Sequence, residues 1–235
     1  MSIETINRRV VHCTRCPELR TYCAQIASEK KRAYLGETYW GKPVPSFGED
    51  CAQIMIVGLA PGAHGSNRTG RMFTGDASGD FLFPALFRAG LANQPTAIGR
   101  KDGLQLRNLL ITAAARCAPP ANKPTPQELR NCFPYLVEEF ETLRRLRIIL
   151  AFGAIAFKAA LDLLADRDFS IEPQRPKFGH GIEARASKQQ RLVTVISSFH
   201  PSRQNTNTGK LTQPMFDAIF RRTKQLLAEG DYAPD

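Results

Sequence analysis

Residues 54–62 are Ile-Met-Ile-Val-Gly-Leu-Ala-Pro-Gly, a short and continuously apolar run that leads into a loop of small residues. Three other runs are of the same kind, at residues 109–115, 147–152 and 192–199. Such runs are typical of strands that are buried on both faces of a sheet. Helical patterns lie between and after them, so the sequence predicts an α/β fold with a four-stranded parallel sheet between two layers of helices.

The helices are expected at about residues 78–90, 125–145, 154–165 and 214–228. We expect Ser78 to cap the first helix and Pro84 to delay or kink it. In the second, Thr125 is the expected cap, and Glu128 completes a capping box.

A chain of 235 residues, 43% of them hydrophobic, fits one domain with a sizeable core. Residues 169–190 are polar and are expected to form an excursion loop, and residues 230–235 are expected to fray. The formal net charge of +10 suits a polyanionic partner such as nucleic acid, although a merely soluble basic protein is an equally good interpretation of charge alone.

No apolar run has the length of a signal peptide core or a membrane helix, so we expect a cytoplasmic protein with no membrane partner. Disulfides are unusual in that compartment, and clustered cysteines there indicate metal or redox chemistry. Cys13 and Cys16 form a C-x-x-C pair, and Cys117 and Cys132 form a wider one. Four thiolates that meet in space would hold zinc or a [4Fe–4S] cluster, and the alternative is four unrelated buried thiols.

The two remaining cysteines, Cys23 and Cys51, are assigned to packing. His12, beside the first pair, is a candidate substitute ligand, although an exposed histidine is the more common case.

In parallel sheets, ligands bind beyond the carboxyl ends of the strands. The loop Gly58-Leu-Ala-Pro-Gly62 brings small residues to that edge, and residues 70–79 add an aromatic ring, Phe73, and a carboxylate, Asp76. A flat ring can stack on an extruded base, and a fixed carboxylate can stabilise positive charge on a sugar. The alternative is that Asp76 or Ser78 caps the next helix and that Phe73 belongs to the core.

His200 follows the last predicted strand and begins the polar segment Pro-Ser-Arg-Gln-Asn-Thr-Asn-Thr-Gly. A neutral imidazole there can donate a hydrogen bond to a departing anion, or it can simply be hydrogen-bonded at the start of a loop. Five cations lie in or beside these loops and form either a phosphate-binding rim or solvated surface charge: Arg68, Arg71, Lys123, Arg203 and Lys210.

The order of the Cys13/Cys16 pair, Gly58-Leu-Ala-Pro-Gly62, residues 70–79 and His200-Pro-Ser resembles the uracil-DNA glycosylase superfamily. The segment that begins at Cys117 and the later Cys132 resemble its iron–sulfur branches. Apolar Leu59 and Ala60 occupy positions where most of the superfamily has Asp, Asn or Glu. This is similar to family 5, the type B enzymes, in which the following loop supplies the carboxylate.

The resemblance implies a three-layer αβα domain over residues 1–235, with a cluster-binding segment at about residues 1–50. It implies that Cys13, Cys16, Cys117 and Cys132 ligate a structural [4Fe–4S] cluster. It further implies these pocket residues: Asp76, His200 and Asn122 as catalytic groups, and Gly58, Ala60, Gly62, Phe73 and Asn205 as substrate contacts. Arg203 would fill or probe the gap in the duplex.

The implied activity is hydrolysis of the N-glycosidic bond of uracil in single- or double-stranded DNA, leaving an abasic site, by a monomeric enzyme. Ala113 stands where family 4 has a uracil-reading Asn, which implies a broader range of deaminated and damaged bases. Two other interpretations remain: a non-catalytic nucleic-acid-binding protein with a structural zinc or iron–sulfur site, and an iron–sulfur electron carrier.

Overall fold

The computed structural model describes residues 1–229, and the prediction for residues 230–235 lies outside them. The four predicted strands form the parallel centre of one sheet in the order β3 (Leu109–Ala113), β2 (Ile54–Gly58), β4 (Ile148–Phe152) and β7 (Arg191–Ser198). The residues of β2, β3 and β4 are buried throughout, as expected for strands covered on both faces.

Three strands that the sequence analysis did not predict extend this sheet to seven. β1 (Phe47–Gly48) lies antiparallel to β3, and β6 (Glu183–Lys188) and β5 (Ser170–Glu172) continue the sheet beyond β7. The expectation of an excursion loop over residues 169–190 is therefore wrong. In β6 only Ala184 and Ala186 turn inward, between exposed or half-buried polar neighbours, so its short alternation is easily mistaken for a polar loop.

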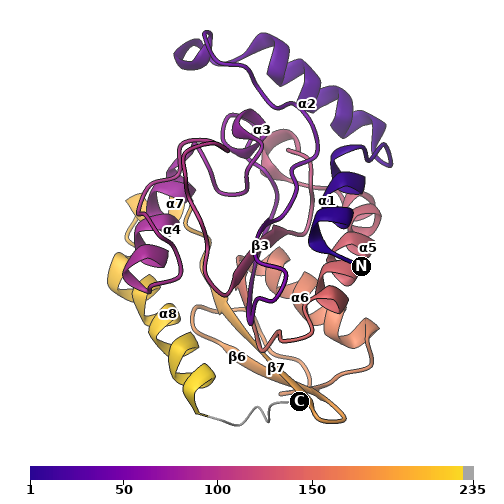
Figure 1. The fold of residues 1–235 in the computed structure, drawn as a ribbon, viewed down its shortest axis with the longest axis vertical. Coiled ribbons are helices and arrows are strands. Elements are labelled where there is room, and N and C mark those ends of the chain that lie inside the picture. Colours follow the sequence, from indigo (N-terminus) through magenta and orange to yellow (C-terminus); the bar gives the residue numbers. More distant parts are fainter. Residues whose placement is uncertain (230–235) are drawn as a thin grey trace.

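Helices cover both faces of the sheet, which confirms the three-layer α/β architecture (Figure 1). One face packs against α1 (Ile3–Val11), α5 (Pro126–Thr142) and α6 (Ala154–Asp166). The other packs against α4 (Ala77–Arg88) and α8 (Gln213–Ala228). Successive side chains of the strands divide between these two cores: Ile54 and Ile56 enter one, and Met55 and Val57 enter the other.

The remaining helices lie around the carboxyl edge of the parallel strands and near the amino terminus. They are α2 (Pro17–Glu29), α3 (Ser66–Thr69) and α7 (Arg203–Asn207), with 3-10 turns at Arg32–Tyr34 and Pro120–Asn122. α2 extends beyond the layers at one end of the molecule (Figure 1). Within residues 1–229, no helix combines the length and the apolar character that crossing a membrane requires.

The helix caps test the local predictions. Thr125 and Glu128 form the predicted capping box of α5, which ends at Thr142 rather than at residue 145. Helix α4 is capped by Asp76 and not by Ser78, because the Asp76 side chain accepts hydrogen bonds from the amides of Ser78 and Gly79. Pro84 lies inside α4.

Candidate active site

Phe73 and His200 meet at the carboxyl edge of the parallel strands. Their ring centroids are 5.7 Å apart, and the rings are inclined by 25°. Gly58, the last residue of β2, makes room for this contact, since a Cβ there would lie 2.8 Å from the Phe73 ring. A Cβ on Gly153, directly after β4, would lie 3.6 Å from the His200 Cβ. The ends of three neighbouring strands, β2, β4 and β7, therefore converge on this pair of rings.

The backbone of Phe73 has a φ of +52°, a conformation that is unfavourable for a bulky residue. Its surroundings hold it there: the Phe73 carbonyl lies so close to Gly79 that a Cβ on Gly79 would come within 1.9 Å of the carbonyl oxygen. The ring also packs edge-on against Phe152. Backbone strain that the surrounding structure maintains in this way is typical of functional sites.

Asp76 has two roles divided between its two oxygens. Oδ1 accepts from the amides of Ser78 and Gly79, at 3.0 and 3.3 Å. Oδ2 has no hydrogen-bond partner within residues 1–229 and faces the backbone of Gly62 and Gly65, where a Cβ would come within 2.9 and 2.0 Å of it. Burial raises the pKa of Asp76 above its usual value, against the lowering effect of the two amides. The carboxylate is thus fixed by one oxygen and available at the other.

The His200 residue is half-buried, and desolvation of its imidazole, with no charged partner within residues 1–229, lowers its pKa to about 4. The imidazole is consequently neutral at neutral pH and can donate one N–H. The segment that follows is not an open loop, since residues Arg203–Asn207 form α7. Asn205 Nδ2 donates to the His200 carbonyl at 2.9 Å, so Asn205 holds the backbone that carries the imidazole.

The other predicted pocket residues lie differently. Ala60 and Gly62 belong to the loop after β2, beside Asp76, and both are half-buried. Asn122 is exposed in the 3-10 turn after β3, and in the described chain no contact joins it to Phe73, Asp76 or His200. The structure therefore does not bring Asn122 to the other two predicted catalytic residues, Asp76 and His200.

Arg68 and Arg71 are buried and are not surface cations, so their assignment to a phosphate-binding rim is wrong. Arg71 forms a two-pronged ion pair with Asp102, and Arg68 pairs with Glu37 and donates to the carbonyls of His64 and Gly75. They stabilise the loops that carry Asp76. No local spacing signals these pairs, because each partner lies 31 residues away.

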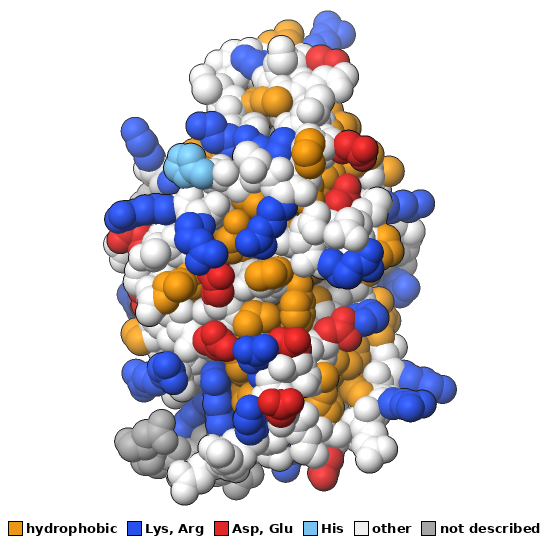
Figure 2. Space-filling model, turned by 90° about the vertical axis from the view of Figure 1, so that its right-hand side faces the viewer, with side chains coloured by type: hydrophobic (Ala, Val, Ile, Leu, Met, Phe, Trp, Pro, Cys, Tyr) orange, Lys and Arg blue, Asp and Glu red, His pale blue; other side chains and the backbone are white. Residues whose placement is uncertain are grey.

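Three of the predicted cations remain exposed: Lys123, Arg203 and Lys210. Arg203 begins α7, and the Lys210 ammonium lies 4.8 Å from the Phe199 ring centre, next to His200. Positive side chains are not confined to this edge, since Lys and Arg are also spread over the face that Figure 2 shows.

Cys13, Cys16, Cys117 and Cys132 line one small cavity that is partly open to solvent. It lies between the start of α2, the loop after β3 and α5. Burial and the neighbouring Cys16 and Cys13 raise the pKa of Cys132 to about 11, against the lowering effect of Arg116. The pKa of Cys117 is also raised, first by a hydrogen bond with Cys23 and then by burial. Asn131 Nδ2 donates to Cys16 Sγ at 3.3 Å.

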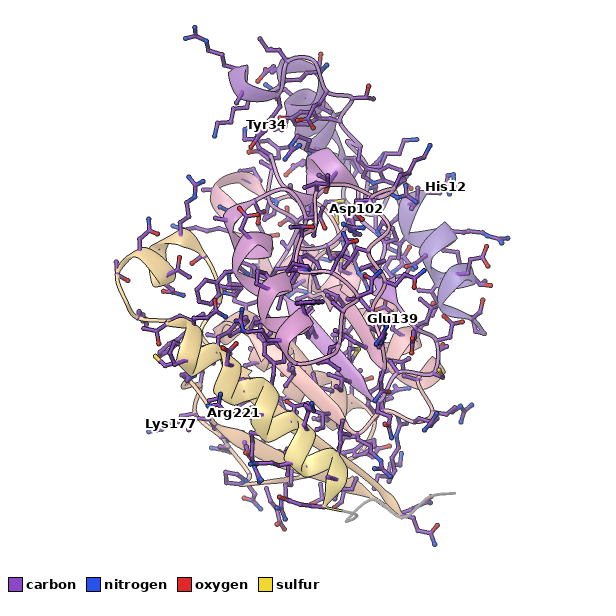
Figure 3. All side chains as sticks on the ribbon, turned by 60° about the vertical axis from the view of Figure 1, so that its left-hand side comes forward. His12, Tyr34, Asp102, Glu139, Lys177 and Arg221 are labelled. Atoms are coloured by element: carbon purple, nitrogen blue, oxygen red, sulfur yellow. The ribbon has the colours of Figure 1, made fainter. Side chains whose placement is uncertain are left out.

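The remaining cysteines and His12 differ in their exposure. Cys23 is fully buried beside Cys117, which confirms its packing assignment, whereas Cys51 is exposed and its packing assignment is wrong. His12 is exposed and bonds to the Arg8 carbonyl, and Figure 3 shows it at the edge of the molecule. Among residues 1–229, no three His, Cys, Asp or Glu side chains converge closely enough to hold a single metal ion.

The cavity also contains buried donors that lack acceptors. Arg20 Nη1 and Arg116 Nε and Nη1 have no hydrogen-bond partner in the described chain, and both residues line the cavity with the four cysteines. Orphaned buried donors require an explanation, and a negatively charged group in the cavity provides one. Four cysteines line one cavity with unpaired cationic donors beside it, and within residues 1–229 no three ligands converge on one point, so the lining fits a cluster better than one zinc ion.

Comparison with known proteins identifies the family of the chain. The sequence profile of the Uracil DNA glycosylase superfamily matches residues 45–224. The chain is 44% identical over 226 residues to the Type-5 uracil-DNA glycosylase of Mycobacterium bovis, covering 96% of this chain and 82% of that protein. It is 43% identical over 226 residues to the enzyme of the same name from Thermus thermophilus, covering 96% and 99%. A Type-4 uracil-DNA glycosylase of Pyrobaculum aerophilum is 33% identical over 203 residues, covering 86% and 84%.

Proposed function

The chain belongs to the uracil-DNA glycosylase superfamily and is a DNA repair glycosylase that acts on uracil, and on this premise we propose how its own residues cleave the N-glycosidic bond. The observation that carries the proposal is the contact between the Phe73 and His200 rings at the carboxyl edge of the sheet, with Asp76 fixed three residues after Phe73 against the loop that follows β2. The bond breaks to give positive charge on the sugar and negative charge on the departing base, and the site has one group suited to each.

In the proposed mechanism, Phe73 provides the aromatic face on which an extruded base stacks. Its strained backbone is held before the substrate arrives, so ordering this ring costs little on binding. His200 donates a hydrogen bond to the departing base. Because the imidazole is already neutral, it can stabilise the negative charge without first losing a proton.

We assign the sugar side of the reaction to Asp76. Its free Oδ2 stabilises the oxocarbenium-like sugar or positions the attacking water. Water completes the hydrolysis and leaves an abasic site. No lysine lies at a motif position where a Schiff base would form, which agrees with a monofunctional enzyme.

We further propose that the enzyme accepts deaminated and damaged bases besides uracil. Ala113, at the end of β3, has no side-chain amide to read the uracil edge, and Leu59 and Ala60 add none. A pocket with few discriminating hydrogen bonds rejects altered bases weakly.

Cys13, Cys16, Cys117 and Cys132 are the proposed ligands of a [4Fe–4S] cluster. Such a cluster would serve a structural purpose, by joining α2, the loop after β3 and α5. We also propose that Arg203, Lys210 and Lys123 contact DNA phosphates, and that the enzyme is a cytoplasmic monomer. Membership of a glycosylase superfamily favours neither a non-catalytic DNA-binding protein nor an electron carrier.

Cleavage of a uracil-containing oligonucleotide by alkali after incubation with the enzyme tests the proposal. Asp76→Asn preserves the cap of α4, because Asn is as good a cap as Asp, but removes the charge. We expect its single-turnover rate to fall by roughly 10²–10³-fold, with little change in melting temperature.

Ser78→Ala is the matched control, because only the backbone of Ser78 bonds to Asp76. It should retain the wild-type rate. An Asp76→Asn variant as active as this control would refute the assignment of Asp76.

A further inference from the structure

Arg20, which is half-buried, and Arg116, which is buried, are unusual among the arginines with little exposure in residues 1–229. The Arg71 guanidinium donates to Asp102 and Thr74. The Arg68 guanidinium donates to two backbone carbonyls and to Glu37. Arg191 leaves only Nε unpaired and donates through Nη2 to two carbonyls. By contrast, Arg116 is 1% exposed and has no acceptor for either Nε or Nη1.

A fixed internal contact holds Arg116 in this position. Its guanidinium forms an ion pair with Glu139 of α5, 2.5 Å between Nη2 and Oε2, and Thr112 of β3 donates to the same Glu139 oxygen at 2.7 Å. All three side chains are buried, and Figure 3 shows Glu139 within the body of the molecule. The ion pair anchors one side of the guanidinium and leaves the remaining N–H groups without acceptors beside the cysteine cavity.

The charges around the cavity are also unbalanced. Arg15, Arg20 and Arg116 line it, and within residues 1–229 Glu139 is the one carboxylate paired with any of them, which leaves two positive charges in excess. An oxidised [4Fe–4S] core with four cysteine thiolates carries two negative charges. The lining of the cavity therefore complements that group in both sign and amount.

We infer that Arg20 and Arg116 are positioning residues for the proposed cluster, and that their unpaired N–H groups donate to its thiolate or sulfide sulfurs. Arg20 would add positive charge beside the cluster, whereas the charge of Arg116 is paired with Glu139 and its contribution would be the donated N–H groups. This inference rests on the cluster proposed above and goes beyond it, since it makes retention and electronic state of the cluster depend on two residues that are not ligands.

Arg20→Met tests the inference most directly, because Met replaces the charge with an apolar chain and no carboxylate in residues 1–229 pairs with Arg20 and would be left unpaired. The holoenzyme is purified without oxygen, and its iron and sulfide content, its rate of bleaching by EDTA and its midpoint potential are measured. We expect about tenfold faster bleaching. Reduction adds negative charge, so the variant should also be about tenfold harder to reduce, which is 59 mV for a one-electron couple.

Arg20→Lys restores the charge and should recover most of both effects. For the second residue, the double variant Arg116→Met with Glu139→Gln avoids leaving an unpaired buried carboxylate, and it should change bleaching and potential in the same direction. Arg130→Met is the control, since Arg130 is exposed on the same helix as Cys132 and does not line the cavity.

If the wild-type protein contains the cluster and these variants have its bleaching rate and its midpoint potential, the inference is overturned while the cluster assignment stands. If the wild-type protein contains no iron and sulfide, the cluster and this inference fail together. Neither result affects the glycosylase proposal, which the Asp76→Asn assay tests independently.

Discussion

The carboxyl edge of the sheet and the cysteine cavity differ in how far the chain itself fixes the state of their polar groups. At the edge, Asp76 caps α4 through Oδ1 and burial keeps His200 neutral, so the position of the carboxylate and the protonation state of the imidazole are set before any ligand is present. In the cavity, buried donors of Arg20 and Arg116 have no acceptor within residues 1–229. The groups of the first region are positioned by the protein alone, whereas in our proposal a bound cluster completes the second.

His200→Ala should separate the two regions with the largest effect. Removal of one preorganised donor to a developing anion costs roughly 10²–10³-fold in rate. We expect this loss in single-turnover excision of uracil. Iron content should remain that of the wild-type protein, because His200 does not line the cysteine cavity. A variant that loses iron together with activity would show that the two regions are not independent.

Gly65→Ala tests whether Asp76 must be held in place. The new Cβ would lie 2.0 Å from Asp76 Oδ2, and no positive φ adds backbone strain at Gly65. A displacement of about 1 Å in a catalytic group can cost on the order of 10²-fold, so we expect a rate loss approaching that value. Gly99→Ala is the control because its Cβ would meet nothing within 4 Å. Equal rates for the two variants would contradict the proposed role of the Gly65 contact.

The pH profile gives the smallest effect, about tenfold per pH unit. Burial raises the pKa of Asp76, so excision that needs its carboxylate should decline with falling pH at values above those of an ordinary Asp. His200 has a pKa of about 4 and should add no loss near pH 6.5. The kcat/KM of excision, measured with circular dichroism at each pH to exclude unfolding, checks this. A loss centred near pH 6.5 that disappears in His200→Gln would contradict a neutral imidazole.

Patterns that depend on neighbouring residues were predictable. The four central strands follow from continuous apolar runs, and the capping box of Thr125 and Glu128 follows from a spacing of three residues. The convergence of Phe73, Asp76 and His200 required more, namely the resemblance of four ordered motifs to a known superfamily. Residue chemistry alone favoured Asp76 as a helix cap, and the structure shows that it is one.

Partners distant in the chain were not predictable. Arg68 and Arg71 are the residue type expected in a DNA-binding rim. They are instead buried in ion pairs with Glu37 and Asp102, each 31 residues away in the chain. Likewise, β5 and β6 are strands because β7 supplies an unpaired edge, although their own sequence is polar.

The sequence by itself determined the α/β class, the parallel centre of the sheet and the order of the motifs, because periodicity and caps act over a few residues. The tertiary structure alone decided which charges are buried and paired, which oxygen of Asp76 is free, and that Arg20 and Arg116 line the same cavity as the four cysteines. Burial and pairing are set by contacts between distant segments, and the free energy of a charge depends on those contacts more than on its neighbours in the chain.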